Sequence, residues 1–349
     1  MAHLAKRSTR YARRMSFAAL SQRAQVVRLR PTALAALPAY PFTVRRLRLL
    51  NHAYNTTFRV DTQEGQTFAL RINVNSRRTP QQIGAEMAWL AALAHDTELP
   101  VPVPQPTRDG HLLQELWNPA LGRALPVTVF SWLPGPNLGR HATPAQMREV
   151  GRAAATLHAH ALGWTLPSGT ALSSLRDPLM DTPNRLIREH ALLTPERRDI
   201  VLAALARVEA ALGRVFVQDT PRVLHADLHN WNLKWNRGRL SVFDFDDSGV
   251  GVPMQDLAIS AYYLRPRVDL EAALLEGYAF AAPLPTYAQA DYEAVVAGRS
   301  LVLLNDLLEN TTANLRDLLP RYVPNAVIKL RHYLETGVFR HDVEGLIQA

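Results

Sequence analysis

Three polar residues in the second half of the chain have the types and spacing that phosphoryl transfer needs. Asp227 and Asn232 share one short stretch that begins at His225, and Asp244 follows Asn232 by twelve residues. Transfer of a γ-phosphoryl group requires a carboxylate that orients the attacking hydroxyl and accepts its proton, together with oxygen ligands that hold Mg²⁺ on the phosphates. Mg²⁺ binds through one or two carboxylates plus substrate phosphates. Asp227, Asn232 and Asp244 supply that set.

The residues around this set predict the strands that position it. A short apolar strand precedes the loop that carries Asp227 and Asn232. A hairpin of two further strands, turning at Asn236–Gly238, leads to Asp244. We therefore expect the three side chains to lie at neighbouring strand ends and to converge on one metal ion.

A blander interpretation of the same residues is a solvated loop in which aspartate and asparagine only cap turns. A second motif, Asp244 followed by Asp246, argues against this interpretation, because it lies in the hairpin that directly follows the loop of Asp227 and Asn232. We expect His225 to orient or pack the loop and His229 to lie on the surface, since neither repeats at a spacing typical of zinc ligands.

With these motifs, and with Gln255–Asp256 after them, the sequence resembles the aminoglycoside phosphotransferase and choline kinase-like superfamily, relatives of the protein kinases. The resemblance extends over nearly the whole chain from about Ala33. Residues 243–251 are most similar to the branch that holds type II homoserine kinase-like enzymes and a bacterial stress-response Ser/Thr kinase. It implies an α+β, bilobal protein kinase-like fold, with a small antiparallel β lobe before a larger, mainly helical lobe.

The resemblance also implies individual roles. Asp227 matches the catalytic aspartate, and Asn232 and Asp244 match the metal ligands. Asp246 stands where protein kinases carry the glycine of their Asp-Phe-Gly motif. It is either an extra metal or substrate contact or a hydrogen-bond acceptor behind the metal ligands.

The first half of the chain predicts a nucleotide-covering lobe. Residues 49–60 indicate a hairpin and residues 67–72 a third strand. The first turn contains no glycine, which excludes a Gly-rich loop and a Walker A motif there. In the superfamily this turn is often rich in asparagine, so Asn55 and Thr56 are expected near the phosphates. The alternative is a hairpin turn that binds nothing.

Arg71 occupies the third-strand position where protein kinases carry a lysine, and arginine is common there in the homoserine kinase-like branch. A guanidinium keeps its charge and grips phosphate and carboxylate in a bidentate manner. The next helix is predicted to begin at Thr79–Pro80 and carries Glu86. We predict an ion pair between Arg71 and Glu86, against an alternative in which both side chains are solvated.

The two lobes are expected to join at a hinge. Four prolines in residues 100–106 predict an extended connector before it. The resemblance places the hinge itself at residues 131–135, where backbone groups of Ser131 and Leu133 would receive adenine.

From Thr143 onward the apolar periodicity is helical. Expected helical segments begin at Thr143–Pro144 and Thr194–Pro195 and then cover residues 257–264, 270–280, 290–308 and 326–334. The pair His158 and His160 is expected on a helix surface rather than at a metal. A polar wall of the acceptor pocket is predicted from Asp306, Glu309 and Asn310, which would favour a cationic acceptor; an exposed helix face is the alternative.

Composition limits the possibilities. The 349 residues are 47% hydrophobic, which suffices for a large core in two lobes. The chain has no cysteine, so disulfides and thiolate chemistry are excluded. No apolar run reaches the about 18 residues of a membrane span, and we expect a cytoplasmic protein.

The net charge of +8 arises near the start of the chain. Residues 1–50 hold 11 of the 39 Lys and Arg residues and no Asp or Glu, so 28 basic residues face 31 acidic ones in the remainder. Nucleic-acid binding is therefore not expected of the enzyme body.

The Arg-rich start admits several explanations. It could be an organelle-targeting peptide, a nucleic-acid or lipid-binding arm, or upstream sequence that precedes a true start at Met15. We favour a solvated or vestigial segment. The expected division of the chain is a basic extension at 1–32, the nucleotide-covering lobe at 33–130 and the helical lobe with the catalytic loop at 131–349.

The sequence as a whole predicts an ATP- and Mg²⁺-dependent phosphotransferase that acts on a hydroxyl of a small molecule. GTP is not excluded, and the acceptor and oligomeric state cannot be inferred. Two other possibilities stay open: a protein Ser/Thr kinase of the stress-response type, and a nucleotide-binding scaffold without turnover, which the glycine-free turn and Arg71 motivate.

Overall fold

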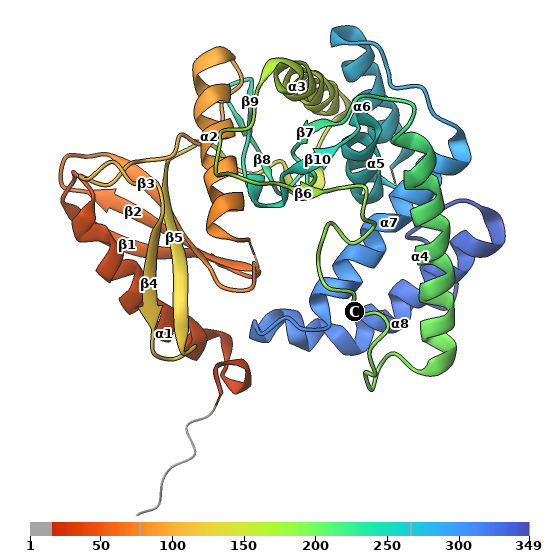
Figure 1. Ribbon diagram of the computed structural model, residues 1–349, viewed down its shortest axis with the longest axis horizontal. Coiled ribbons are helices and arrows are strands. Elements are labelled where there is room, and N and C mark those ends of the chain that lie inside the picture. Colours follow the sequence, from red (N-terminus) through yellow and green to blue (C-terminus); the bar gives the residue numbers. More distant parts are fainter. Residues whose placement is uncertain (1–15, 77, 266, 349) are drawn as a thin grey trace, which may run out of the picture.

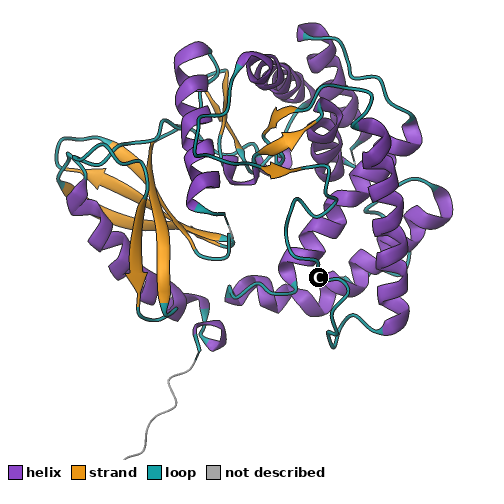
Figure 2. Cartoon of the chain, viewed as in Figure 1, coloured by secondary structure: helices purple, strands orange, loops and turns teal. Residues whose placement is uncertain are grey.

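The computed structural model describes residues 16–76, 78–265 and 267–348. It consists of two lobes (Figure 1). The N-terminal lobe is built on a five-stranded antiparallel sheet, and the C-terminal lobe is mainly helical with two small sheets (Figure 2). The predicted α+β bilobal fold is confirmed.

The sheet of the N-terminal lobe has the strand order β1-β2-β3-β5-β4. Its strands are β1 (Val44–His52), β2 (Asn55–Thr62), β3 (Thr67–Asn73), β4 (Gln114–Asn118) and β5 (Arg123–Ser131). The hairpin between β2 and β3 turns at Gly65, whose φ of 83° suits glycine. Every second residue at the start of β2 is buried, as expected of a strand with one face on a core.

Helix α1 (Gln22–Ala36) packs against this sheet and is part of the lobe. Its apolar residues Leu29, Ala33 and Ala36 are fully buried in the same cluster as Phe58 of β2. The expectation of a solvated N-terminal segment is therefore wrong for this helix, and the expected division after residue 32 falls inside it. Met15 and the residues before it lie outside the described residues.

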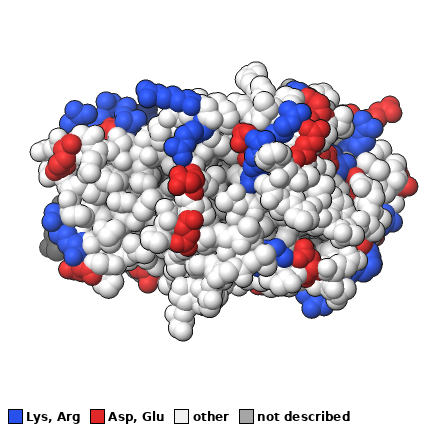
Figure 3. Space-filling model, turned by 90° about the horizontal axis from the view of Figure 1, so that it is seen from above, with Lys and Arg blue, Asp and Glu red and all other residues white. Residues whose placement is uncertain are grey.

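The outer surfaces of α1 and β1 are basic. Arg23, Arg28, Arg45 and Arg46 are all exposed. Figure 3 shows several basic side chains at the N-lobe end of the visible face, with a few acidic ones near them.

Helix α2 (Pro80–Asp96) begins where the sequence predicts. The side chain of Thr79 accepts a hydrogen bond from the backbone N–H of Gln82, whose side chain in turn accepts from the backbone N–H of Thr79. The buried face of the helix, which includes Met87, joins the core of the C-terminal lobe. Trp89 meets Phe245 edge-on, with ring centroids 5.4 Å apart.

The proline-rich connector runs beside β5. Pro104 forms an isolated antiparallel β-bridge with Phe130, and the N–H of Gln105 donates to the carbonyl of Val129 at 2.8 Å. The two segments thus approach the predicted hinge together.

The C-terminal lobe consists of six long helices and short strands. The helices are α3 (Pro144–Gly163), α4 (Pro195–Val215), α5 (Pro253–Leu264), α6 (Val268–Ala281), α7 (Gln289–Leu307) and α8 (Ala313–Thr336). The strands β6 (Ser173–Ser174), β10 (Gly249–Gly251) and β7 (Arg222–Leu224) form one small sheet, and β8 (Leu233–Asn236) and β9 (Arg239–Val242) form the predicted hairpin.

Helices α3 and α6 cross at two glycines. A Cβ atom on Gly151 would collide with the backbone of Leu274, and one on Gly277 would collide with the backbone of Arg148. The close crossing of these helices therefore requires glycine on both sides.

Helix α8 is longer than the sequence predicts. The expected segment was 326–334, but the helix starts at Ala313 and contains Pro320 and Pro324. Proline removes one backbone hydrogen bond and normally ends a helix. Burial of Val323 and Pro324 against the core offsets that cost here. No helix in the described part of the chain is long and apolar enough to cross a membrane.

A second junction joins the lobes away from the hinge. Gln25 of α1 donates to the carbonyl of Thr311 at 2.7 Å and accepts from the N–H of Ala313 at 3.0 Å. The side chain of Asn75, after β3, donates to the hydroxyl of Thr312 at 2.8 Å. The start of α8 is thereby attached to the N-terminal lobe.

The packing of α1 leads to a stability prediction. Leu29→Ala should lower the free energy of unfolding by about 2–5 kcal/mol, since it empties a fully buried site. Val27→Ala on the same helix is the matched control, because Val27 is 61% exposed, and should change it by less than about 0.5 kcal/mol. Chemical denaturation of the full chain measures both. Equal stabilities for the two variants would show that α1 is not part of the folded lobe.

Candidate functional site

The loop that carries Asp227 is anchored by the buried carboxylate of Asp256. Ala226 has a φ of 62°, a left-handed conformation that is unfavourable for alanine. The carboxylate of Asp256, in the first turn of α5, accepts from the N–H of His225 at 3.1 Å and of Ala226 at 2.6 Å. It also contacts Nε2 of His158 at 3.0 Å. Asp256 therefore fixes the strained turn just before the predicted catalytic residue.

Asp227 is surrounded by polar partners on both carboxylate oxygens. Nδ2 of Asn232 donates to Oδ2 at 3.0 Å, and Nε2 of His229 lies 3.3 Å from the same oxygen. The guanidinium of Arg299 and the hydroxyl of Tyr263 donate to Oδ1, the latter at 3.3 Å. The orientation of the carboxylate is thus fully specified by neighbours.

Arg299 determines the charge state of this carboxylate. Burial alone would raise the pKa of Asp227, but the positive charge of Arg299, followed by that of His229, outweighs burial and holds the pKa below its ordinary value. Arg299 is itself buried on α7. Its Nε donates to the hydroxyl of Tyr263 at 3.0 Å and its Nη1 to Asp247 at 3.3 Å. Asp227 is accordingly ionised throughout the physiological range.

The loop that leads to Asp244 lies beside Asn232. The N–H of Phe243 donates to the carbonyl of Asn232 at 3.0 Å, and Nε2 of His225 donates to the carbonyl of Phe243 at 3.1 Å. The buried ring of His225, whose pKa is lowered by burial, therefore orients the two loops rather than acting as a base. Like Ala226, Asp244 has a left-handed backbone conformation, with a φ of 66°.

The side chains of Asn232 and Asp244 fit a magnesium ion. Because Nδ2 of Asn232 is directed at Asp227, its Oδ1 is left as the ligand atom. The side chain of Asp244 is open to solvent, yet surrounding protein and the charge of Asp246 raise its pKa. A bound cation would reverse that shift. Among the described residues, no three His, Asp or Glu side chains form a metal cluster by themselves, so Mg²⁺ would need phosphate oxygens as further ligands.

The predicted ion pair between Arg71 and Glu86 is confirmed. The two guanidinium nitrogens donate to the two carboxylate oxygens at 2.8 and 2.6 Å, and both side chains are buried. Nε of Arg71 donates to Oδ1 of Asn73 at 3.2 Å. The guanidinium of β3 is therefore held in a fixed position against α2.

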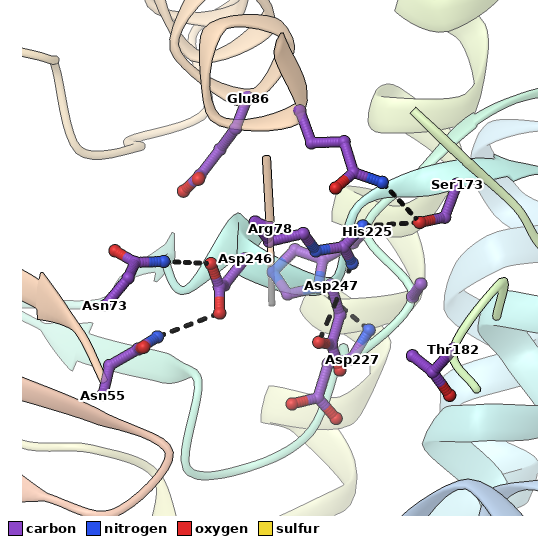
Figure 4. A network of polar contacts seen from close by, with 12 residues as sticks. Asn55, Asn73, Arg78, Glu86, Ser173, Thr182, His225, Asp227, Asp246 and Asp247 are labelled. Carbon is purple, nitrogen blue, oxygen red and sulfur yellow. Dashed lines mark hydrogen bonds and ion pairs between the residues drawn. The ribbon is translucent and has the colours of Figure 1, made fainter. Parts of the chain in front are cut away.

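Asp246 is directed at the N-terminal lobe (Figure 4). Its carboxylate accepts from Nδ2 of Asn55 at 2.9 Å and from Nδ2 of Asn73 at 3.1 Å, and it lies 3.8 Å from Arg71. Arg71, Arg78 and Asn55 hold its pKa low against the effect of burial. Of the two roles that the sequence left open for Asp246, this geometry corresponds to the hydrogen-bond acceptor.

The other predicted nucleotide residues are placed unequally. Asn55 faces the cleft through its contact with Asp246, but Thr56 is fully buried and its hydroxyl is 2.8 Å from Nδ1 of His52, contrary to expectation. Thr56 lies on the opposite face of β2 from Asn55, because neighbouring strand residues alternate. At the hinge, the N–H of Ser131 donates to Val103, and Leu133 is half-buried.

The predicted polar wall carries paired charges. Nε of Arg185 and Nη1 of Arg188 donate to Glu309 at 2.7 and 2.6 Å, and Arg185 also lies 3.6 Å from Asp306. Asn310 is buried and accepts from the N–H of Thr312. The arginines offset the negative charge, so the expected preference for a cationic acceptor loses its basis.

Sequence reasoning missed Arg299 and Tyr263. Arg299 stands in an otherwise apolar run of α7 between Val295 and Leu304. A charged residue within a buried helix face must have a partner, and that signal was available in the sequence. The partner itself, 72 positions away, was not.

Two histidine expectations are wrong. His229 was expected on the surface, but its ring contacts Asp227 and packs against the ring of Tyr263, with centroids 4.3 Å apart. His158 was expected on a helix surface, but it is buried between Asp256 and the hydroxyl of Tyr278. Both rings support Asp227, the first directly and the second through Asp256.

Comparison with known proteins identifies similar chains. Amicoumacin kinase of Bacillus subtilis strain 168 is 25% identical over 229 residues, which are 65% of this chain and 66% of that protein. The solved structure of a microcompartment-associated aminopropanol kinase matches with a TM-score of 0.74 and 25% identity over 89% of this chain and 99% of that one.

Two more solved structures share the fold. One is an amicoumacin kinase in complex with AMP-PNP, Ca²⁺ and Ami, with a TM-score of 0.70 and 18% identity over 87% of this chain and 95% of that one. The other is a spectinomycin phosphotransferase, with a TM-score of 0.57 and 12% identity over 88% and 98%. The model of the phosphotransferase enzyme family matches residues 18–292, which include every residue of the Asp227 centre except Arg299. This chain therefore belongs to the phosphotransferase enzyme family.

Proposed function

We propose that this enzyme transfers the γ-phosphoryl group of ATP to a hydroxyl of a small molecule, with Mg²⁺ as the metal. The observation that carries the proposal is the proximity of Asp227, Asn232 and Asp244 on two neighbouring loops of the helical lobe. The named activities of the similar proteins, amicoumacin kinase and aminopropanol kinase, support a small-molecule acceptor.

The nucleotide would lie under the sheet of the N-terminal lobe. Arg71 uses only part of its five N–H groups on Glu86 and Asn73, so donors remain for a phosphate oxygen. The side chain of Asn55 connects this lobe to Asp246 of the helical lobe through a hydrogen bond. The AMP-PNP complex of a structurally similar kinase supports ATP as the donor.

Asn232 and Asp244 would hold the metal. When bound, Mg²⁺ would neutralise charge on the phosphates and keep Asp244 ionised. The protein would contribute Oδ1 of Asn232 and the exposed carboxylate of Asp244 as ligands. The hydrogen bond from Asn232 to Asp227 would keep the metal at a fixed distance from the carboxylate that receives the acceptor.

Asp227 would receive the acceptor. In the reaction, the acceptor oxygen bonds to the γ-phosphorus while the bond from that phosphorus to the bridging oxygen breaks and ADP leaves. The hydroxyl proton passes to Asp227. Because Arg299 and Asn232 fix the carboxylate, most of its contribution is orientation of the hydroxyl. Arg299 acts as a positioning residue that keeps Asp227 ionised.

One prediction from the proposed function concerns turnover. Asp227→Asn should lower kcat by at least about 100-fold, the contribution of a positioned base, while AMP-PNP binding changes little. Asp269→Asn, a change of an exposed aspartate on α6, is the control and should leave both unaltered. ADP release is measured with a panel of hydroxyl-bearing metabolites that includes aminopropanol and amicoumacin.

The same assay separates the competing functions. Acceptor-dependent ADP release that disappears in Asp227→Asn supports the proposal. Labelled phosphate that enters only protein would refute the small-molecule acceptor, and nucleotide binding without turnover of any acceptor would refute the enzymatic role assigned to Asp227.

The second prediction concerns pH. Loss of the cation in Arg299→Gln should raise the pKa of Asp227, because burial then acts without its main opposition. Activity requires the ionised form, so the acidic limb of kcat/KM should move to higher pH by about one pH unit or more. Arg299→Lys, which keeps the charge, should restore much of the original profile. In the wild-type enzyme the pKa of Asp227 is so low that the protein should unfold in acid before this limb is reached.

Folding of the Arg299 variants needs a separate check, because removing one partner from a buried ion pair costs about 3–5 kcal/mol. AMP-PNP binding provides it, since Arg299 contacts no predicted nucleotide residue. A folded Arg299→Gln enzyme with an unchanged pH profile would contradict the positioning role.

A further inference from the structure

A cavity lies among α5, α7, α8 and residues near the end of the chain. Its volume is about 370 Å³, within the roughly 300–1,000 Å³ of small-molecule sites. Leu346–Gln348 close one side of it, and Asn325 of α8 holds that segment through two hydrogen bonds with the backbone of Ile347, at 3.0 and 2.8 Å. The chain end is marked C in Figure 1, beside α8.

Two cations line this cavity, and none of the described residues in its wall carries a carboxylate. Arg321 makes no hydrogen bond or ion pair with any residue that the structure describes. Lys329 donates from Nζ to Nδ1 of His341 at 3.1 Å. His341 is neutral, because burial and the charge of Lys329 lower its pKa to about 4, and its Nε2 donates to the carbonyl of Tyr262. Both positive charges therefore lack a counter-charge among the described residues.

Two buried hydroxyls in the same cavity share one polar neighbour. Oγ of Ser300, a residue only 1% exposed, and the hydroxyl of Tyr322 both lie beside the phenol of Tyr262, and neither forms a well-aligned hydrogen bond with it. A hydroxyl group rotates about its C–O bond, so both can turn toward a ligand in the cavity.

An anion satisfies all of these groups together. Guanidinium, ammonium and hydroxyl groups are donors to carboxylate and phosphate oxygens. The rest of the wall, which includes Leu318 and Ala326, is apolar and accommodates a carbon skeleton. We propose that this cavity binds a small organic anion, with its carboxylate or phosphate group between Arg321 and Lys329 and within reach of Ser300 and Tyr322.

The site is adjacent to the catalytic centre but separate from it. Ser300 follows Arg299 on α7, and Tyr262 precedes Tyr263 on α5, so these two wall residues are sequence neighbours of residues that contact Asp227. The anionic group could belong to an independent ligand or to a distal part of the acceptor; the chemistry of recognition is the same.

Isothermal titration with inorganic phosphate and with citrate tests the proposal. The full-length protein is saturated with AMP-PNP and Mg²⁺ so that the nucleotide site is filled, and ionic strength is held constant with NaCl. At least one probe should bind in a saturable manner. Affinity should fall at least about tenfold, 1.4 kcal/mol, in Arg321→Gln, and also fall in Lys329→Met. Arg331→Gln, an exposed arginine on the same helix, should bind like the wild type.

Retained AMP-PNP binding and an unchanged melting temperature show that the variants are folded. Failure of both probes to bind the wild type, or equal affinity in wild type and Arg321→Gln, would overturn the proposal. Ser300→Ala supplies a second variant that removes no charge and should weaken binding too. Repeating the titration with an identified acceptor distinguishes the two sources: competition assigns the anionic group to the acceptor, and independent binding assigns it to a separate ligand.

Discussion

The partly buried carboxylate of Asp227 is the constraint around which the helical lobe is arranged. An ionised group that is removed from water requires compensating charge and hydrogen bonds. Arg299 supplies the charge from α7, Tyr263 supplies a hydroxyl from α5, and Asn232 supplies an amide from the same loop. Below them, Asp256 fixes the turn at Ala226. Two helices and the catalytic loop are thus coupled through one side chain.

The lobes are connected by polar contacts on two sides of the cleft. Asp246 bonds to Asn55 and Asn73 beside the predicted phosphate site, and Gln25 and Asn75 hold the residues before α8. A nucleotide would enter between these contacts. Asp246 therefore makes a contact that glycine, which has no side chain, could not make: it connects the loop of Asp244 to strands β2 and β3.

Local signals in the sequence predicted much of this arrangement. Motif spacing placed Asp227, Asn232 and Asp244 together, and the Thr79–Pro80 start and the charge of Arg71 led to the pair with Glu86. The failures were of another kind. α1 is held by small buried residues that give little periodic signal, and α8 continues through two prolines because its burial offsets them.

Long-range pairing accounts for the remaining failures. His229 and His158 looked like surface residues because their carboxylate partners are identified only by the fold. The same holds for Arg299, whose burial could be inferred from its apolar neighbours but whose partner could not. The acceptor wall was misjudged because Arg185 and Arg188 come from a distant loop.

The most direct measurement is a crystal structure of the wild-type enzyme with AMP-PNP and Mg²⁺. We predict a metal ion bound by Oδ1 of Asn232 and the carboxylate of Asp244 and shared with the phosphates, a phosphate within reach of Arg71, and the γ-phosphate facing Asp227. A nucleotide whose phosphates lie away from Asp227, or a metal that contacts neither Asn232 nor Asp244, would contradict the account.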